Sequence, residues 1–573
     1  MFALEAMLTD LIFLYGEETG RTTFARLVGL IEQNRPLISA QYHSQLSQRD
    51  AILITYGDQV QKQGESPLHT LAEFCSKHLA GLVSGLHILP FFPYSSDDGF
   101  SVIDYRRVDP ALGNWQDILD LNRDFRLMFD AVVNHVSAQS AWFRGFLAGE
   151  KRFQDFFIVV EGHHDLSKVV RPRTLPLLTH FTTSAGDKML WNTFSADQID
   201  LNYRNPEVLV EIIDLLFDYV QKGAEFIRLD AIAYLWKEIG TACIHLPQTH
   251  AIIRIMHATL ERVAPQVKLI TETNVPHSEN MSYFGNGKDE AHLIYNFALP
   301  PLILYTLQKG DAGPLSAWAG GLRLPSQQVT FFNFLASHDG IGLTPLRGIL
   351  QEGAIEELAR RTLAQGGLVS YRSNPDGSQS AYELNINYFD ALANPDREEP
   401  LENQIGRFLA AHAIQLALVG VPAIYFHSLF GSRGWPEGVR LTGRKRSLNR
   451  QKLTLADLEL DLENPNTLRS RIFQGMARLI KARASHAAFQ PYSEQRVFDC
   501  GGQVFGLFRS DSDSNGQVLC LQNVSAQPAL VNLPGEIISQ TGMTIDLLSG
   551  ERMIIESGDN LRLSPYQTRW LAY

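Results

Sequence analysis

The sequence predicts an α/β protein built on a (β/α)8 barrel (a TIM barrel), with inserted subdomains and a small C-terminal all-β domain. Short apolar runs alternate with segments of helical periodicity over most of the chain, which is typical of repeated βαβ units. Two connections after predicted strands are long, and short alternating strands replace this pattern after residue 487. About eight repeats over roughly 400 residues suit a closed barrel better than an open doubly wound sheet, which is the alternative.

The predicted elements follow one another in regular order. Residues 1–50 show apolar residues at helical spacing, which predicts a helical extension before the first strand. The helical segments between strands are 68–79, 115–122, 208–220 and 252–263. The apolar runs predicted as barrel strands are 51–56, 85–91, 126–133, 226–230, 267–272, 330–336 and 422–426. No Gly-x-Gly-x-x-Gly follows the first run, which argues against a dinucleotide-binding sheet.

The long connections set the expected domain boundaries. We expect one subdomain inserted after the third strand and another, carrying a loop that contacts the acceptor, after the seventh strand. The barrel with its N-terminal extension would comprise 1–136, 204–339 and 404–486, the two insertions 137–203 and 340–403, and the C-terminal β-domain 487–573.

Composition and charge exclude several classes of protein. The formal net charge of −12 argues against nucleic acid as the main partner. The four cysteines form no C-x-x-C pair, and the N-terminus lacks a basic segment of a signal peptide, so we expect a cytoplasmic protein. The apolar run from Phe408 to Phe426 is interrupted by polar residues and by Pro422, which predicts a buried helix, a turn and a buried strand.

The run 226–230 carries one cation and one carboxylate, Arg228 and Asp230. Because side chains alternate along a strand, these two residues project to the same side near the strand end. An adjacent arginine favours the ionised form of an aspartate. Covalent catalysis at a sugar carbon requires such a carboxylate, although a structural Arg–Asp pair would give the same pattern.

Polar residues also end or follow the other apolar runs. They are Asp58, His87, Asp130 with Asn134 and His135, Glu272, and His338 with Asp339. In a barrel all carboxyl ends of the strands open on one face, so residues far apart in sequence meet there. Any one of these residues could be a cap or a solvated loop residue, but their joint occurrence favours a site.

The chemistry that suits this set is glycoside chemistry. Double displacement needs one carboxylate that attacks the anomeric carbon and a second, protonated one that releases the leaving oxygen. Asp230, beside Arg228, is the better nucleophile. Glu272 follows the apolar Leu269 and Ile270 with no adjacent cation, so it is the better acid. Asp339 with His338 could hold sugar hydroxyls.

These residues carry a resemblance to a known family. Asp130-x-x-x-Asn134-His135, Arg228-x-Asp230, Glu272 and His338-Asp339 together resemble the four short signatures of the α-amylase superfamily, glycoside hydrolase family 13. The resemblance covers roughly residues 50–480. It implies that Asp230 is the nucleophile, Glu272 the general acid/base and Asp339 the stabiliser of the transition state.

A narrower resemblance, to the sucrose phosphorylase subfamily, rests on further stretches such as Leu86-His-Ile-Leu-Pro-Phe-Phe92 and Phe297-Ala-Leu-Pro-Pro301. Those enzymes move glucose from an α-glucoside to orthophosphate and produce α-glucose 1-phosphate. By position, the residues expected to contact glucose are Asp58, His87, Gln198, Arg228, His338 and Arg446. Those expected toward the acceptor and phosphate are Pro172, Arg173, Tyr234, Asn274, Tyr382 and Glu383. Arginines suit phosphate because they offer bidentate contacts.

The loop from Tyr371 to Asn385 departs from sucrose phosphorylase and resembles relatives that cleave glucosylglycerol or glucosylglycerate. Glu383 near the acceptor would repel a carboxylate and accept a hydrogen bond from a neutral polyol, whereas Arg372 would do the reverse. Ala381 stands where a proline is expected in the glucosylglycerate enzymes. We therefore expect glucosylglycerol first and glucosylglycerate next, with sucrose or sucrose phosphate as the alternative.

The expected partners are an α-glucoside and inorganic phosphate, without a nucleic acid or a membrane, and the expected assembly is a monomer or a homodimer. In many amylases the asparagine that matches Asn134 helps bind calcium, but no further cluster of carboxylates completes such a shell here, so we predict no metal and no cofactor. Hydrolysis or transglucosylation on the same site, and a non-catalytic carbohydrate-binding protein, are the competing functions.

Overall fold

The computed structural model describes residues 2–38, 45–172, 175–373, 378–394, 398–511, 516–533, 542–556 and 558–573. Within these residues, eight parallel strands close into a barrel in the order β1-β16-β12-β11-β10-β9-β4-β3, which confirms the predicted fold. In chain order the strands are β1 (Ile52–Thr55), β3 (Gly85–Ile88), β4 (Arg126–Ala131), β9 (Ala224–Leu229), β10 (Lys268–Thr271), β11 (Leu293–Tyr295), β12 (Thr330–Phe334) and β16 (Val421–Tyr425). The sequence analysis did not locate β11, since a strand of three residues gives too short an apolar pattern.

Helices connect successive strands and cover the barrel. They are α3 (Pro67–His78), α4 (Trp115–Leu121), α6 (Pro206–Gln221), α7 (Pro247–Val263), α8 (His277–Met281), α9 (Leu299–Lys309), α10 (Gly313–Gly321), α13 (Leu401–Ala417) and α17 (Leu468–Ala484). Local chemistry sets their ends: the Asn205 side chain caps α6 by accepting the Glu207 N–H, and Pro206 fits the first helical position. Gly223 then adopts a φ of 96°, which turns the chain into β9.

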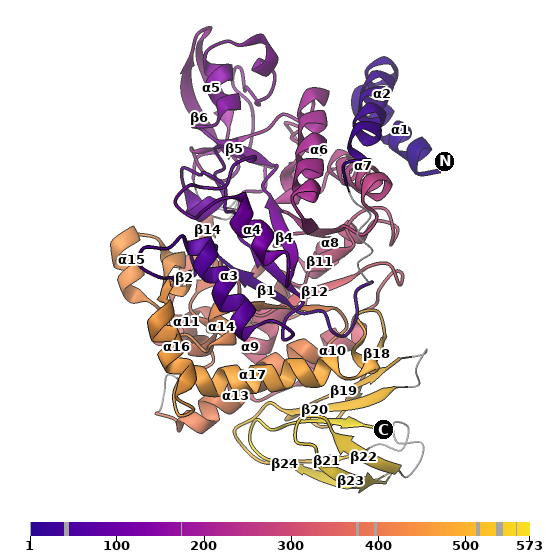
Figure 1. The fold of residues 1–573 in the computed structure, drawn as a ribbon, viewed down its shortest axis with the longest axis vertical. Helices are drawn as coiled ribbons and strands as arrows, with labels where there is room; N and C mark the ends of the chain where they lie inside the picture. Colours follow the sequence, from indigo (N-terminus) through magenta and orange to yellow (C-terminus); the bar gives the residue numbers. More distant parts are fainter. Residues whose placement is uncertain are drawn as a thin grey trace.

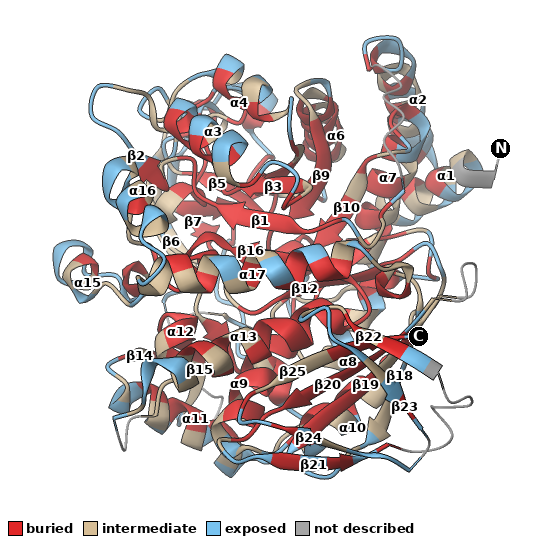
Figure 2. Ribbon diagram, turned by 60° about the horizontal axis from the view of Figure 1, so that its bottom comes forward, coloured by how far each residue is buried: buried red, intermediate tan, exposed pale blue. Residues whose placement is uncertain are grey.

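The barrel interior is the core of the molecule. Figure 2 shows the barrel strands β1, β3, β9, β12 and β16 buried along their length. The run from Phe408 to Phe426 forms the end of α13, a turn and β16, as predicted. Among the described residues, no helix combines the length and apolar character needed to cross a membrane.

The N-terminal helices α1 (Phe2–Tyr15) and α2 (Glu17–Asn34) lie against the outside of the barrel beside α6 and α7 (Figure 1). The Asp10 carboxylate of α1 binds Arg254 of α7, with Oδ1 at 2.6 Å from Nη2. The Tyr15 hydroxyl donates to the carbonyl of Tyr203 at 3.0 Å. These contacts fix the helical extension to the α6–α7 side of the barrel.

Both long connections contain small sheets that extend from the carboxyl ends of strands (Figure 1). The connection from β4 to α6 holds α5 (Ala141–Leu147), the hairpin of β6 (Leu178–Thr183) with β7 (Gly186–Trp191), and the pair of β5 (His135–Ser137) with β8 (Gln198–Asp200). The connection from β12 to α13 holds α11 (Glu352–Ala364) and a three-stranded sheet of β13 (Ile341–Gly342), β15 (Gln379–Asn385) and β14 (Leu368–Ser373).

The C-terminal region is all β, as predicted, and lies at the opposite end of the molecule from α5 and β6 (Figure 1). Its six-stranded antiparallel sheet is formed by β18 (Glu494–Asp499), β19 (Val504–Ser510), β20 (Gln517–Asn523), β25 (Thr568–Ala572), β22 (Gly542–Asp546) and β23 (Arg552–Ile555). A second pair joins β21 (Ala529–Asn532) to β24 (Asn560–Leu563). Buried Arg509 donates to the Ala417 carbonyl at 2.7 Å and so ties this region to α13.

Candidate active site

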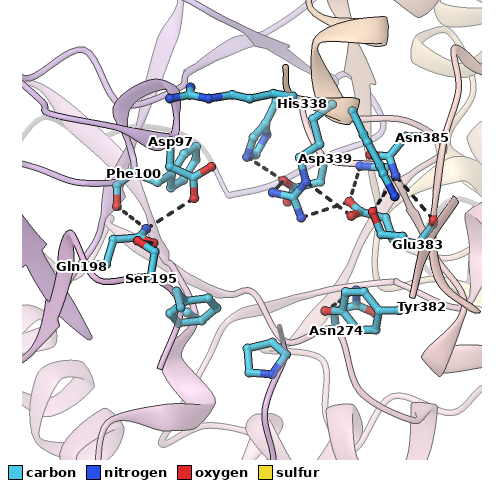
Figure 3. Close-up of a pocket in the computed structure, with 18 of the residues that line it drawn as sticks. Asp97, Phe100, Ser195, Gln198, Asn274, His338, Asp339, Tyr382, Glu383 and Asn385 are labelled. Carbon is cyan, nitrogen blue, oxygen red and sulfur yellow. Dashed lines mark hydrogen bonds and ion pairs between the residues drawn. The ribbon is translucent and has the colours of Figure 1, made fainter. Parts of the chain in front are cut away.

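The carboxyl ends of the barrel strands surround a cavity of about 530 Å³. Its wall includes Asp230, Glu272 and Asp339, which follow three different strands. Residues of β14 and β15, Pro172 with parts of the segment 175–198, and residues of the segment 444–450 complete the wall. Figure 3 shows Gln198 and Ser195 on one side of the cavity and Asp339, Glu383 and Asn385 on the other.

Buried Arg228 lies beneath the cavity and contacts three carboxylates. Arg228 of β9 pairs in register with Asp130 of β4, and its Nη1 lies 2.5 Å from Asp130 Oδ1. The same Nη1 lies 2.7 Å from Asp230 Oδ1, and Nη2 lies 3.8 Å from Glu272 Oε2. Arg228 and Asp230 therefore project to the same side of the strand, as predicted. The contacts of the guanidinium also place Asp230 and Glu272 on the same side of the site.

A backbone contact also joins the two carboxylates. Ala231, directly after Asp230, adopts a left-handed φ of 50°, which is costly for a residue with a Cβ. In this conformation its N–H donates to Glu272 Oε2 at 3.1 Å. The strained turn after Asp230 thus fixes the Glu272 carboxylate at the adjacent strand ends of β9 and β10.

The carboxylate pair retains a proton because of its surroundings. Burial raises the pKa of Asp230, and the charge of Glu272 adds to the rise, whereas Arg228 opposes it. Burial also raises the pKa of Glu272, and Asp339 adds to that rise. The 2.7 Å contact of Arg228 with Asp230, against 3.8 Å with Glu272, favours the ionised form at Asp230 and the proton at Glu272. Sequence reasoning found the arginine but not the effect of burial on the pKa values of both acids.

Asp339 lies in a cationic environment. Arg446 Nη1 lies 2.5 Å and Arg450 Nη2 3.8 Å from Asp339 Oδ1. Although burial opposes ionisation, Arg446 and the neighbouring cations lower the pKa of Asp339. Burial lowers the pKa of His338 to about 3, so its imidazole is neutral at 3.5 Å from Asp339 Oδ1. Asp339 therefore stays ionised while Asp230 and Glu272 share a proton.

The opposite wall is fixed by a hydrogen-bonded group around Phe100. Gln198 Nε2 donates to the Phe100 carbonyl at 3.0 Å, and His135 Nε2 lies 3.0 Å from the same oxygen. Ser195 Oγ donates to Gln198 Oε1 at 2.8 Å. The Phe100 ring stacks on His338 with a centroid separation of 4.7 Å. This group gives the cavity both an apolar face and amide groups, which is a surface suited to a sugar ring.

The predicted acceptor residues on β15 line the cavity. Asn274 Nδ2 donates to the Tyr382 hydroxyl at 3.4 Å. Buried Glu383 accepts the Gly340 N–H at 2.7 Å, and its Oε1 lies 3.0 Å from Arg446 Nη2. The charge of Glu383 is therefore compensated by an arginine that also contacts Asp339.

Other predicted residues lie behind or beside the cavity wall. His87 Nε2 contacts Asp130 Oδ2 at 2.7 Å and so supports the residue that orients Arg228. Asp58 Oδ1 lies 2.5 Å from Lys452 Nζ. Partly buried Tyr234 packs edge-on against Phe194, whose ring centroid is 5.6 Å away. Pro172 lies on the wall, whereas Arg173 is outside the described residues.

Sequence reasoning missed several residues of the site. Asp98, with a φ of 51°, binds both Arg444, at 2.8 Å, and Arg450. Arg450 also donates to the His338 carbonyl at 2.7 Å. The signal that could have identified these cations is the basic run after β16, which contains Arg444, Lys445, Arg446 and Arg450.

The ammonium group of Lys237 lies beside the side chain of Asn134. Lys237 Nζ lies 2.7 Å from Asn134 Oδ1 and 2.6 Å from Asp200 Oδ2, with all three side chains buried. The Thr193 N–H also donates to Asp200, at 2.9 Å. Lys237 thus supplies a positive charge where the oxygen atoms of Asn134 and Asp200 converge.

Elsewhere among the described residues, one group has a geometry that could hold a metal ion, and it lies on and before α3, away from the cavity. It consists of Glu65, His69 and Glu73. Such partly exposed groups are common without an ion.

Comparison with known proteins decides the family. Residues 78–319 match the model of the α-amylase catalytic domain. The glucosylglycerate phosphorylase of Spirochaeta thermophila is 47% identical over 584 aligned positions, covering 100% of this chain and 99% of that protein. The chain belongs to the α-amylase superfamily. Within this family its relatives are glycoside phosphorylases, as the sequence motifs predicted.

More distant relatives in the α-amylase superfamily have names that specify other substrates. The glucosylglycerol phosphorylase of Marinobacter adhaerens is 30% identical and aligns with 77% of this chain and 88% of its own length. The crystal structure of sucrose 6F-phosphate phosphorylase from Thermoanaerobacter thermosaccharolyticum superimposes with a TM-score of 0.72 at 25% identity, covering 91% of this chain and 100% of that one. Both similarities agree with a barrel that carries phosphorylase chemistry.

Proposed function

We propose that this protein is a retaining phosphorylase that transfers glucose from glucosylglycerate to orthophosphate and releases α-glucose 1-phosphate and glycerate. The similarity to a glucosylglycerate phosphorylase over the full chain carries the choice of substrate. The paired Asp230 and Glu272 at one cavity support the mechanism. This order reverses the sequence-based preference for glucosylglycerol, which the comparisons support less.

In the first step Asp230 attacks the anomeric carbon as the bond to the glycerate oxygen breaks. Glu272 gives its proton to that oxygen, and a covalent glucosyl-enzyme forms. Burial raises the pKa of Asp230, but Arg228, 2.7 Å away, opposes that rise and favours the ionised nucleophile with the proton on Glu272. In the second step a phosphate oxygen attacks the same carbon and Glu272 takes the phosphate proton. Two inversions give net retention.

Asp339 stabilises positive charge that develops on the ring. Its carboxylate is kept ionised by Arg446 and Arg450 and faces the cavity beside His338. A fixed negative charge near an oxocarbenium-like centre lowers the barrier because it needs no reorganisation during the reaction. Gln198, on the opposite wall, is placed to contact hydroxyls of the same glucose unit.

The surroundings of Glu383 explain why a carboxylate-bearing acceptor is compatible with this site. The sequence argument against glycerate assumed that Glu383 presents a bare charge to the acceptor. Instead, Glu383 is buried, contacts Arg446 at 3.0 Å and accepts the Gly340 N–H. A carboxylate paired with an arginine repels a second carboxylate less than an unpaired one does. The contact with Arg446 therefore weakens the objection to glycerate.

One assay tests the proposal. The protein is incubated with glucosylglycerate, glucosylglycerol or sucrose, each with and without orthophosphate, and glucose 1-phosphate and free glucose are measured. We expect phosphate-dependent glucose 1-phosphate, formed with the highest kcat/KM from glucosylglycerate. Equal amounts of free glucose under both conditions would establish hydrolysis and contradict the proposal. Glucose 1-phosphate formed fastest from glucosylglycerol would restore the earlier preference.

A further inference from the structure

Among the described residues of the cavity wall, four cations differ in how their charge is compensated. They are Arg444, Lys445, Arg446 and Arg450. Arg446 binds the carboxylates of Asp339 and Glu383, and both Arg444 and Arg450 bind Asp98. In the described part of the chain, Lys445 is the member of this set without a carboxylate within ion-pair distance, and its ammonium donates instead to the Val369 carbonyl at 2.7 Å.

The contact with Val369 places the ammonium at a defined position. Val369 belongs to β14, and the next two residues of that strand, Ser370 and Tyr371, line the cavity. A lysine has three N–H donors, so two remain after the contact with the carbonyl. The ammonium is thus held at the start of the cavity-lining part of β14, with donors left for a ligand.

Neighbouring groups on the same sheet complete a polar surface. Ser370 Oγ accepts a hydrogen bond from Asn385 Nδ2 at 3.0 Å, which leaves its own O–H free to donate. Asn385 Oδ1 is buried without a hydrogen-bond partner in the structure, although the residue lines the cavity. A cationic donor, a hydroxyl donor and an amide acceptor therefore lie on one wall. Figure 3 shows this wall, with Tyr382, Glu383 and Asn385, opposite Gln198 and Ser195.

We propose that Lys445, with Ser370 and Asn385, forms the subsite that recognises the anionic group of the second ligand. The inference rests on the proposed function, in which both glycerate and orthophosphate are anions that enter beside the glucose unit. Lys445 and Ser370 bind the oxyanion, and Asn385 Oδ1 accepts a hydrogen bond from a hydroxyl of glycerate or of monobasic phosphate. Lys445 thereby distinguishes anionic from neutral partners.

The test measures binding rather than turnover, so its result is separate from that of the activity assay. Titration calorimetry is performed with D-glycerate, inorganic phosphate and glycerol on the unmodified protein, Lys445→Met and Lys445→Arg. We expect Lys445→Met to weaken the binding of at least one anion about tenfold, with glycerol unaffected, because a charge-assisted contact is lost. Lys445→Arg should restore part of the affinity, since the charge remains.

Arg440→Met is the matched control. Arg440 pairs with Glu437 on α15 (Pro436–Thr442) and is absent from the cavity wall. Its replacement by Met changes the net charge of the protein as much as Lys445→Met does. Weaker binding of glycerate alone in Lys445→Met assigns the subsite to the acceptor carboxylate, and weaker binding of phosphate alone assigns it to phosphate. Losses equal to those of Arg440→Met, or no binding of either anion to the unmodified protein, would overturn the proposal.

Discussion

The two sides of the cavity are built differently. On the glucose side, Asp230 is buried and Glu272 and Asp339 are partly buried at strand ends, and each contacts an arginine or a strained backbone amide. On the acceptor side, the wall comes from β14, β15 and the segment 444–446, and it includes the exposed Tyr371 and Lys445. Under the proposed function, the chemistry is assigned to the barrel strand ends, whereas the choice of acceptor is assigned to connecting segments, whose sequence can change without altering the barrel.

The largest effect is expected from a substitution on the glucose side of the cavity. Asp230→Asn should lower kcat by at least about 10⁴-fold, since the amide cannot form the covalent intermediate. The melting temperature should not fall, because burial makes the ionised Asp230 carboxylate costly in the folded protein, and the neutral amide avoids that cost. Asp214→Asn on the exposed face of α6, which breaks only the surface pair with Arg106, is the control and should keep full activity. Residual activity within tenfold of the unmodified protein would rule out Asp230 as the nucleophile.

Glu272→Gln should have the next largest effect, about 10²–10⁴-fold on glucosylglycerate. The loss arises because the glycerate oxygen leaves without a proton. With α-glucosyl fluoride the first step should be nearly unimpaired, since fluoride needs no protonation. Pre-steady-state release of fluoride measures that step. Equal losses on both substrates would show that Glu272 positions the sugar and does not act as the acid.

The pH dependence of kcat/KM on glucosylglycerate tests whether Glu272 acts as the acid. Because burial raises the pKa of Glu272, this acid should stay protonated above the ordinary range of glutamate. Activity is therefore present below that raised pKa and is lost as pH rises through it, about tenfold per unit. With α-glucosyl fluoride under conditions in which the first step limits the rate, the alkaline decline should disappear. An unchanged alkaline decline would assign it to another group.

The smallest effect is expected from a substitution on the acceptor side of the cavity. Tyr382→Phe removes the hydroxyl that accepts from Asn274 at 3.4 Å and costs about 1 kcal/mol at most, or roughly fivefold in the KM for glucosylglycerate. The rate of fluoride release from α-glucosyl fluoride should not change, because this measurement involves only the glucose side. A comparable loss with the fluoride would show that the two sides are not independent.

The sequence predicted the barrel and the three carboxylates for one physical reason: parallel strands of a barrel present all their carboxyl ends on one face. It did not locate β11, which is too short for its pattern to be distinguished from a loop. It also treated Glu383 as an unpaired charge, because the contact with Arg446 joins segments that only the fold brings together. The same holds for Lys445, whose neighbours on β14 and β15 are distant in sequence.

The most direct test of the account is to trap the intermediate. Glu272→Gln is mixed with α-glucosyl fluoride, quenched in acid and digested, and the peptides are analysed by mass spectrometry. The account predicts one glucosyl unit on the peptide that contains Asp230, and its removal when phosphate is added before the quench. A glucosyl unit on a different carboxylate would contradict the central claim, as would fluoride release without any labelled peptide.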